Sequence, residues 1–89
     1  MLTIVRKNQF KKDFKKLGRS GQHAGELAEV IKWLQNETSL PPKHRDHPLI
    51  GNYQDYRECH VKGDLLLIYQ KTERELILVR LGSHSELFG

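Results

Sequence analysis

The chain has 89 residues, of which 37% are hydrophobic and 29% are charged, and its formal net charge is +4. This length suits one hydrophobic core, and we expect a single domain over residues 1–89. No apolar run approaches the roughly 20 residues that span a membrane, which excludes a membrane-spanning protein. A single cysteine excludes an internal disulfide framework and predicts a cytoplasmic protein.

Residues 2–6 are rich in β-branched side chains and predict a short strand. Apolar side chains then recur at helical spacing around residues 10–17 and again over residues 27–34, so two amphipathic helices follow. Gly18–Gly21 are expected to end the first helix, and a pair of prolines ends the second. Residues 38–52, which are polar and interrupted by proline, are expected to form a loop.

After a turn at Gly51-Asn52, three strands are predicted. Residues 56–61 alternate in polarity, residues 65–70 are apolar on both faces like a central strand, and residues 75–81 alternate again. Lys62-Gly63 is a turn signal between the first two strands. The order β-α-α-β-β-β predicts an α+β fold, in which two N-terminal helices cover one face of a small, twisted, mainly antiparallel sheet. The other face would be partly open.

Alternation along the first of these strands places Glu58 and His60 together on the open face. Cys59 points to the other face, so we interpret it as a core residue rather than as a nucleophile paired with His60. A strict two-residue turn would direct Asp64 away from His60. We expect instead a longer loop, including Val61 and Asp64, that brings the carboxylate toward the histidine.

Positive charge is concentrated near the N-terminus. Residues 1–19 hold seven of the 15 lysines and arginines but only one of the 11 acidic residues. Such a segment attracts a phosphate backbone or an acidic protein, although a solvated helix face explains the same pattern without a partner.

Three of the five histidines, His47, His60 and His84, lie at the boundaries of expected elements, where catalytic groups tend to collect. Histidine takes and gives a proton near neutral pH, and beside a carboxylate such as Asp64 or Glu58 it suits general acid–base catalysis. The same side chains suit zinc, but no HExxH or CxxC spacing supports a metal site, so we expect no metal and no cofactor. Each histidine by itself also fits a loop or capping role.

These groups are sufficient for metal-free cleavage of RNA, because RNA carries its own nucleophile, the 2′-hydroxyl beside the scissile phosphate. An enzyme need only remove that proton, protonate the leaving 5′-oxygen and offset charge on the phosphoryl oxygens. Arg80 and Arg57 are candidate cations, although strand alternation directs Arg57 toward the helices. Phe88 either stacks on an unpaired base or anchors the C-terminus to the core.

Three short motifs occur in order: D-H-P-L at residues 46–49, Y-R-x-x-H-V at residues 56–61 and G-x-H-x-x-L-F-G at residues 82–89. In combination they resemble YafQ-type toxins of the RelE-like superfamily of bacterial toxin–antitoxin systems, and the resemblance covers residues 1–89 in element order. It implies a RelE-like fold. It also implies a ribosome-dependent endoribonuclease, or mRNA interferase, that inhibits translation by cutting mRNA in the ribosomal A site.

The resemblance also implies partners, and it implies functional positions at His47, His60, Asp64, His84 and Phe88, to which we assign roles as a hypothesis. The partner is a cognate antitoxin, DinJ-like with a ribbon-helix-helix half, and operator DNA is contacted only through it. His84 is the expected general acid and Asp64 or His60 the base, while His47 holds the scissile phosphate. The residues expected to bind substrate are Phe88, Arg80 and Glu58, the last standing where the family often has aspartate. The residues expected to lie against ribosomal RNA are Lys7, Lys11, Lys12, Lys15 and Lys16.

Other classes of function fit the same sequence. A non-catalytic basic module that binds RNA or DNA under the control of an acidic partner needs only the lysine-rich segment. An interaction or structural protein needs none of the histidines. A metal-dependent hydrolase would be distinguished by elemental analysis and by sensitivity to a chelator.

Overall fold

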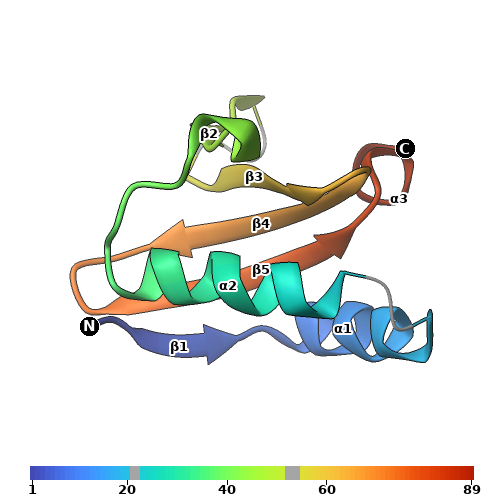
Figure 1. Cartoon of the computed structure of the whole chain (residues 1–89), viewed down its shortest axis with the longest axis horizontal. Helices are drawn as coiled ribbons and strands as arrows, with labels where there is room; N and C mark the ends of the chain where they lie inside the picture. Colours follow the sequence, from blue (N-terminus) through green and yellow to red (C-terminus); the bar gives the residue numbers. More distant parts are fainter. Residues whose placement is uncertain (21–22, 52–54) are drawn as a thin grey trace.

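The structure, a computed structural model, describes residues 1–20, 23–51 and 55–89. Its centre is a five-stranded sheet with the strand order β1-β5-β4-β3-β2 (Figure 1). The β1 strand pairs with β5 in parallel, and the other neighbouring strands are antiparallel. In chain order the elements are β1 (Thr3–Arg6), α1 (Asn8–Ser20), α2 (Ala24–Gln35), the 3₁₀ helix η1 (Pro42–His44), β2 (His47–Pro48), β3 (Arg57–Lys62), β4 (Leu65–Lys71), β5 (Glu75–Gly82) and α3 (His84–Phe88).

The predicted α+β fold is confirmed, and the strand that is apolar on both faces, β4, is the middle strand of the sheet. The region expected to be a loop, residues 38–52, contains η1 and the short edge strand β2 as well. The helix α1 continues through Gly18 to Ser20, which is within the range predicted for its end. Gly21, the last residue of that range, lies outside the described residues. The Asn52 half of the predicted Gly51-Asn52 turn also lies outside the described residues.

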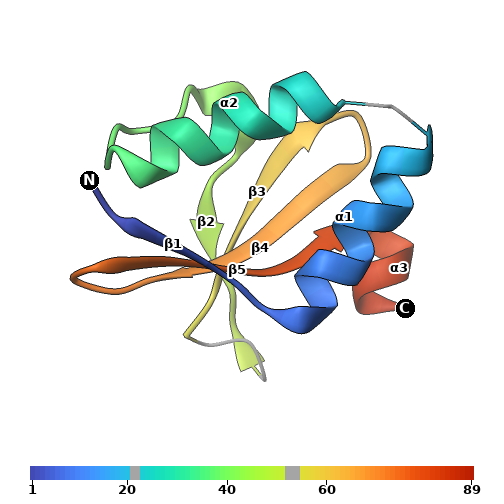
Figure 2. The ribbon, with the colours of Figure 1, turned by 90° about the horizontal axis from the view of Figure 1, so that it is seen from below.

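The main core lies between the sheet and the two long helices, as predicted. The α2 helix packs on one face of the sheet (Figure 2), and its buried side chains are Leu27, Val30 and Leu34. The α1 helix adds Phe10, whereas Phe14, the next member of its apolar stripe, is exposed and stacks on Phe10 with ring centroids 6.1 Å apart. The sheet residues of this core include Cys59, Val61, Leu67, Tyr69, Leu76, Leu78 and Leu81.

The opposite face of the sheet carries a second, smaller core. Leu66 and Ile68 of β4 are buried there under Leu87 of α3. The face expected to be partly open is therefore partly covered by α3, a helix that the predicted order β-α-α-β-β-β does not contain. None of the helices in the described part of the chain is long and apolar enough to cross a membrane.

The hairpin between β3 and β4 differs from both expected forms. Lys62 pairs with Leu65 and His60 pairs with Leu66, so Gly63 and Asp64 form a two-residue turn. Val61 is the extra residue of a β-bulge, buried in the helix-side core rather than released into a loop. The expected longer loop is wrong because Val61 gains by burial, and because Gly63, at φ 56°, supplies the left-handed conformation that this tight turn needs.

Candidate active site

Strand register gathers the predicted site residues on the face opposite the long helices. His47 of β2 pairs with Glu58 of β3, which pairs with Ile68 of β4, which pairs with Arg80 of β5. Directly paired residues project from the same face of a sheet. One row across the sheet thus carries His47, Glu58 and Arg80, with the Arg80 backbone about 10 Å from that of Glu58.

The neighbouring row on the same face brings in two more of the predicted residues. His60 pairs with Leu66, and Leu66 pairs with Gly82 at the end of β5. His84 follows two residues later as the first residue of α3. Segments that are distant in the sequence therefore meet at this part of the sheet.

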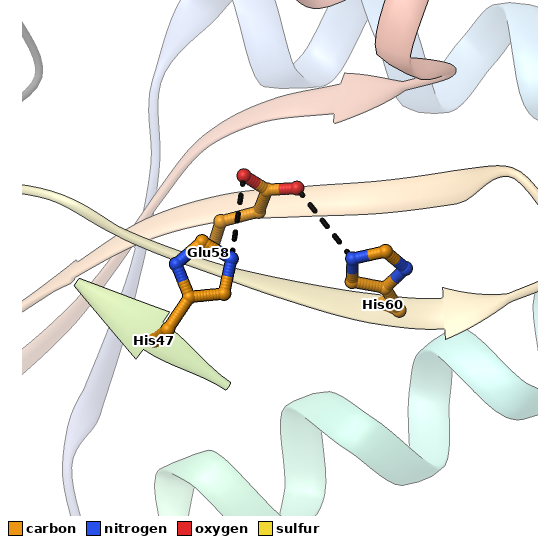
Figure 3. A group of neighbouring side chains, drawn as sticks. All are labelled: His47, Glu58 and His60. Atoms are coloured by element: carbon orange, nitrogen blue, oxygen red, sulfur yellow. Dashed lines mark ion pairs between the residues drawn. The ribbon is translucent and has the colours of Figure 1, made fainter. Parts of the chain in front are cut away.

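Glu58 is the centre of the cluster. It is 5% exposed and is the one buried charged residue in the described part of the chain. Its Oε2 lies 3.8 Å from Nε2 of His47, and its Oε1 lies 3.8 Å from Nε2 of His60. Figure 3 shows the carboxylate reaching both imidazoles, one from β2 and one from its own strand. An ionised carboxylate is costly to bury without a partner. Either imidazole, in its positively charged form, compensates the charge of Glu58.

Asp64 and His84, the other two residues predicted to be catalytic, are exposed and lie outside this close cluster. Asp64 lies in the β3–β4 turn, next to the strand end that carries His60. His84 lies on α3, where its ring contacts Phe88 with centroids 5.1 Å apart. The close cluster within the described residues comprises His47, Glu58 and His60 alone.

The C-terminal segment that carries His84 is a capped helix. The Ser83 hydroxyl accepts a hydrogen bond from the Glu86 backbone N–H, and the Glu86 carboxylate accepts one from the Ser83 N–H, which together form a capping box. Lys16 of α1 also donates to Glu86 at 2.8 Å, and this contact, together with the hydrogen bonds to Ser83, lowers the pKa of Glu86 to about 2. Leu87, rather than Phe88, anchors the helix to the core.

Arg80 is tied to the first helix. Its Nε donates to Oδ2 of Asp13 at 2.9 Å, and the backbone N–H of Leu81 donates to the same oxygen at 3.0 Å. Burial raises the pKa of Asp13, but the hydrogen bonds from Arg80 and Leu81 outweigh burial and hold that pKa below its ordinary value. The guanidinium is thus fixed in direction, and Asp13 offsets part of its charge.

The lysines predicted to contact RNA, on α1 and directly before it, remain exposed to solvent. Within the described residues Lys16 pairs with Glu86, whereas the other four predicted RNA contacts make no ion pair. These four are Lys7, Lys11, Lys12 and Lys15, all exposed. Their charge is therefore available to an external anion.

The thiol of Cys59 plays no part in this cluster. It is fully buried on the helix-covered face, and burial raises its pKa far above the ordinary value. A protonated, buried thiol is a poor nucleophile, so its interpretation as a core residue is confirmed.

Residues 2–89 match the family described as "Bacterial toxin of type II toxin-antitoxin system, YafQ". The chain belongs to this family. The mRNA interferase toxin YafQ of Escherichia coli K12 is 38% identical over 82 residues, covering 91% of this chain and 89% of the relative. A copper-bound mutant toxin from Helicobacter pylori superposes with a TM-score of 0.94 at 48% identity, over 99% of this chain and 100% of that one. The YafQ chain of the E. coli DinJ–YafQ toxin–antitoxin complex gives 0.91 at 35%, over 99% and 98% of the two chains.

A metal ion fits the cluster of this YafQ-family chain. One donor atom from each of His47, Glu58 and His60 lies within 4.8 Å of the other two. Two imidazoles and a carboxylate are donors that Zn²⁺ and Cu²⁺ accept. These three residues would hold such an ion.

The structure adds two features to the predicted site. Glu58, expected to bind substrate or to act beside a histidine in acid–base catalysis, lies between two histidines at the centre of the cluster. Alternation already placed Glu58 beside His60, but only the pairing of β2 with β3 adds His47. Asp46, which lies directly before His47 and is bonded to Arg57 and Tyr69, was recognised as part of the D-H-P-L motif but was given no role.

Proposed function

We propose that this YafQ-family toxin is an endoribonuclease that cleaves mRNA on the ribosome. The observation that carries the proposal is the buried Glu58 carboxylate between His47 and His60, on a sheet face bordered by His84 and Arg80. The similarity to an E. coli toxin named mRNA interferase supports it.

The chemistry uses the nucleophile that RNA supplies. His60, oriented by Glu58, takes the proton of the 2′-hydroxyl, and the 2′-oxygen then bonds to phosphorus. The bond from phosphorus to the 5′-oxygen breaks, and His84 gives its proton to that oxygen. The products are a 2′,3′-cyclic phosphate and a 5′-hydroxyl. Asp64 is the alternative base, because it lies in the turn that follows the strand of His60.

The phosphate and the flanking bases are held by the other residues of the face. His47 donates to a phosphoryl oxygen, and Arg80 offsets the charge that develops there. Phe88, beside His84 on α3, offers an aromatic face to an unpaired base. The exposed lysines of α1 contact ribosomal RNA, with the salt sensitivity that such contacts bring.

No step of this reaction needs a metal ion, because the general base acts on the 2′-hydroxyl directly. A metal ion held by His47, Glu58 and His60 would supply Lewis-acid charge at the cluster. Cleavage that persists in excess EDTA supports the acid–base route, whereas loss with chelator and recovery with one added metal supports a metal-dependent hydrolase.

The partner is a cognate antitoxin. The structure of an E. coli DinJ–YafQ complex supports a DinJ-like partner that binds the toxin and, through its own ribbon-helix-helix half, operator DNA. The site of action is the cytoplasm, where the message is translated.

The test is to induce the chain in bacteria with and without its antitoxin and to map transcript 5′ ends by primer extension. Growth arrest with new 5′ ends is expected, and His84→Ala and Asp64→Ala should each abolish both while antitoxin binding is retained. Asp55→Ala, which also removes an exposed carboxylate from a turn, is the matched control for Asp64→Ala and should remain toxic.

Two results would count against the proposal. Full toxicity of both variants at equal expression contradicts the assigned roles. Growth arrest by the wild-type chain with unchanged transcript ends favours the non-catalytic binding module instead.

A further inference from the structure

Asp46 and His47, adjacent in sequence, face opposite sides of the sheet at its edge. The His47 ring approaches Glu58 on the side that carries the catalytic cluster. The Asp46 carboxylate instead contacts Arg57 and Tyr69, and Tyr69 belongs to the core under the long helices. Asp46 thus belongs to a polar cluster on one face of the sheet and His47 to a polar cluster on the other face. A single peptide bond joins the two residues.

Backbone pairing alone holds His47 weakly. The β2 strand has two residues, His47 and Pro48, and is an edge strand that pairs with β3 only. A proline has no N–H to give to such a ladder. The imidazole must nevertheless stay within a few ångströms of Glu58 for the cluster to exist. After Pro48, the Leu49 N–H donates to the Tyr56 carbonyl oxygen at 2.9 Å. The chain before His47 needs an anchor of its own.

The hydrogen bonds of Asp46 supply that fixation. The Tyr69 hydroxyl donates to Oδ1 of Asp46 at 2.6 Å, and Arg57 Nε lies 3.3 Å from the same oxygen and 3.3 Å from the Tyr69 oxygen. Tyr69 is 2% exposed, and its register partner on β3 is Arg57. The anchor is therefore built on β3 and β4, neither of which is an edge strand, and it is strengthened by charge.

One further contact holds the same segment. A ring nitrogen of His44 lies 2.6 Å from the backbone carbonyl oxygen of His60, so the η1 turn is bonded to the strand that carries the cluster. Arg45 follows with φ 45°, a left-handed conformation that reverses the chain just before Asp46. Such a conformation persists only where the surrounding contacts require it.

We propose that Asp46, Tyr69 and Arg57 form a positioning clamp that sets the place of the His47 imidazole against Glu58, an inference that rests on the proposed ribonuclease function. None of the three is a catalytic residue, because the Asp46 carboxylate lies on the helix-covered side with the other two. Their effect on the reaction passes through His47. A displacement of a phosphate-binding group by about 1 Å can cost a hundredfold in rate.

The first test compares Tyr69→Phe, which removes only the hydroxyl, with the wild-type toxin on translating ribosomes that carry a defined message. We expect kcat to decrease about tenfold or more with little change in KM, because positioning matters most in the transition state. In a His47→Ala background the same substitution should have no further effect. An equal loss in both backgrounds, or unchanged kcat in Tyr69→Phe, overturns the proposal.

Leu27→Val is the matched control for stability. Leu27 belongs to the same helix-side core but lies near the start of α2, where the neighbouring Glu26 bonds Lys62 at the β3–β4 turn rather than Asp46. The substitution should lower Tm while leaving kcat within about twofold, since Leu27 is not part of the clamp. If Leu27→Val reduces kcat as much as Tyr69→Phe, loss of stability alone explains the effect and the proposal fails.

The second test separates position from charge at Asp46. Asp46→Asn keeps the length of the side chain and an oxygen that accepts from Tyr69, whereas Asp46→Glu keeps the charge but adds one methylene. A positioning clamp requires that Asp46→Asn retains more activity than Asp46→Glu. The reverse order overturns it.

The third test does not depend on activity. The ring-proton NMR signals of His47 should shift in Tyr69→Phe and Asp46→Glu but not in Leu27→Val. Unshifted His47 signals in both clamp variants contradict the clamp even if the toxin cleaves mRNA. Shifted signals in a chain that cleaves no mRNA would support the clamp and refute the proposed function.

Discussion

The two faces of the sheet are built from alternate residues of the same strands, but they are organised differently. On the helix-covered side, Cys59 and Leu67 are fully buried in a continuous apolar core that includes both long helices. On the other side, Leu66 and Ile68 form a small core under α3, and beside it lies the buried carboxylate of Glu58. One face holds most of the apolar contacts, and the other holds the charged group whose burial is costly.

Neighbouring residues of one strand therefore serve different purposes, some stabilising the fold and others forming the catalytic cluster. Along β3, Cys59 belongs to the core, whereas Glu58 and His60 belong to the cluster. Substitutions one position apart should therefore separate stability from catalysis. If they do not, the division between a structural face and a catalytic face is wrong.

Replacing Glu58 by glutamine should have the largest effect on activity. The amide keeps the shape but removes the negative charge that orients and balances His47 and His60, so cleavage should decrease by about a hundredfold or more. Stability should be unchanged or higher, because removing a buried charge relieves its desolvation cost. Primer extension on a defined message and thermal melting measure the two quantities. A large decrease in Tm would show that Glu58 is part of the structural core instead.

Replacing Leu67 by alanine tests the other face. Leu67 is fully buried, and the loss of its side chain should lower the free energy of unfolding by about 2–5 kcal/mol. Cleavage per folded molecule should stay close to that of the wild-type chain. Urea denaturation gives the stability, and activity is measured well below the melting temperature. A loss of activity comparable to that of Glu58→Gln would remove the distinction between the faces.

The exposed lysines extend the comparison to the outer surface of α1. Each of Lys11→Ala, Lys12→Ala and Lys15→Ala should weaken binding to the ribosome a few-fold, and should lower the dependence of log K on log salt by about 0.7–0.9 per lost phosphate contact. Lys32→Ala, an exposed lysine of α2, is the matched control and should leave that slope unchanged. Titrations at several salt concentrations give the slope. Identical slopes for α1 and α2 variants would contradict a ribosome contact through α1.

The parts of the fold that could be predicted were those with a repeated pattern. Alternation over the six residues of β3 was sufficient to place Glu58 with His60 and to direct Arg57 toward the helices, where it bonds Asp46 and Tyr69. The β2 strand has two residues, and two residues have no period. Its pairing, and with it the position of His47 opposite Glu58, depends on tertiary contacts that a local pattern does not encode.

The short helix α3 was missed for a different reason, because its signal was present in the sequence. Ser83 and Glu86 have the spacing of a capping box, which marks the beginning of a helix. With Leu87 as its one buried residue, the helix is too short for an apolar stripe. The bulge at Val61 had no such local signal, since it results from burial of that side chain against the long helices.

The contact between Lys16 and Glu86 should have the smallest effect, because it lies at the surface where α1 meets α3. The pKa of Glu86 is about 2 in the folded chain against an ordinary value of 4.5, so the carboxylate stabilises the fold fully above about pH 4.5. This stabilisation is lost as the pH falls toward 2, when the carboxylate becomes protonated in the folded state as well. Glu86→Gln should therefore lower Tm by a few degrees at pH 7, since exposed pairs contribute little, and by almost nothing near pH 2.

Glu73→Gln, which neutralises an exposed carboxylate in the turn before β5, is the matched control and should leave the pH dependence of Tm unchanged. Added salt should reduce the Glu86 effect through screening of the ion pair, while the hydrogen bonds of the capping box persist. If the difference between wild type and Glu86→Gln stays constant from pH 7 to pH 2, the carboxylate charge does not hold α3 in place. The cover of the catalytic face would then depend on Leu87 alone.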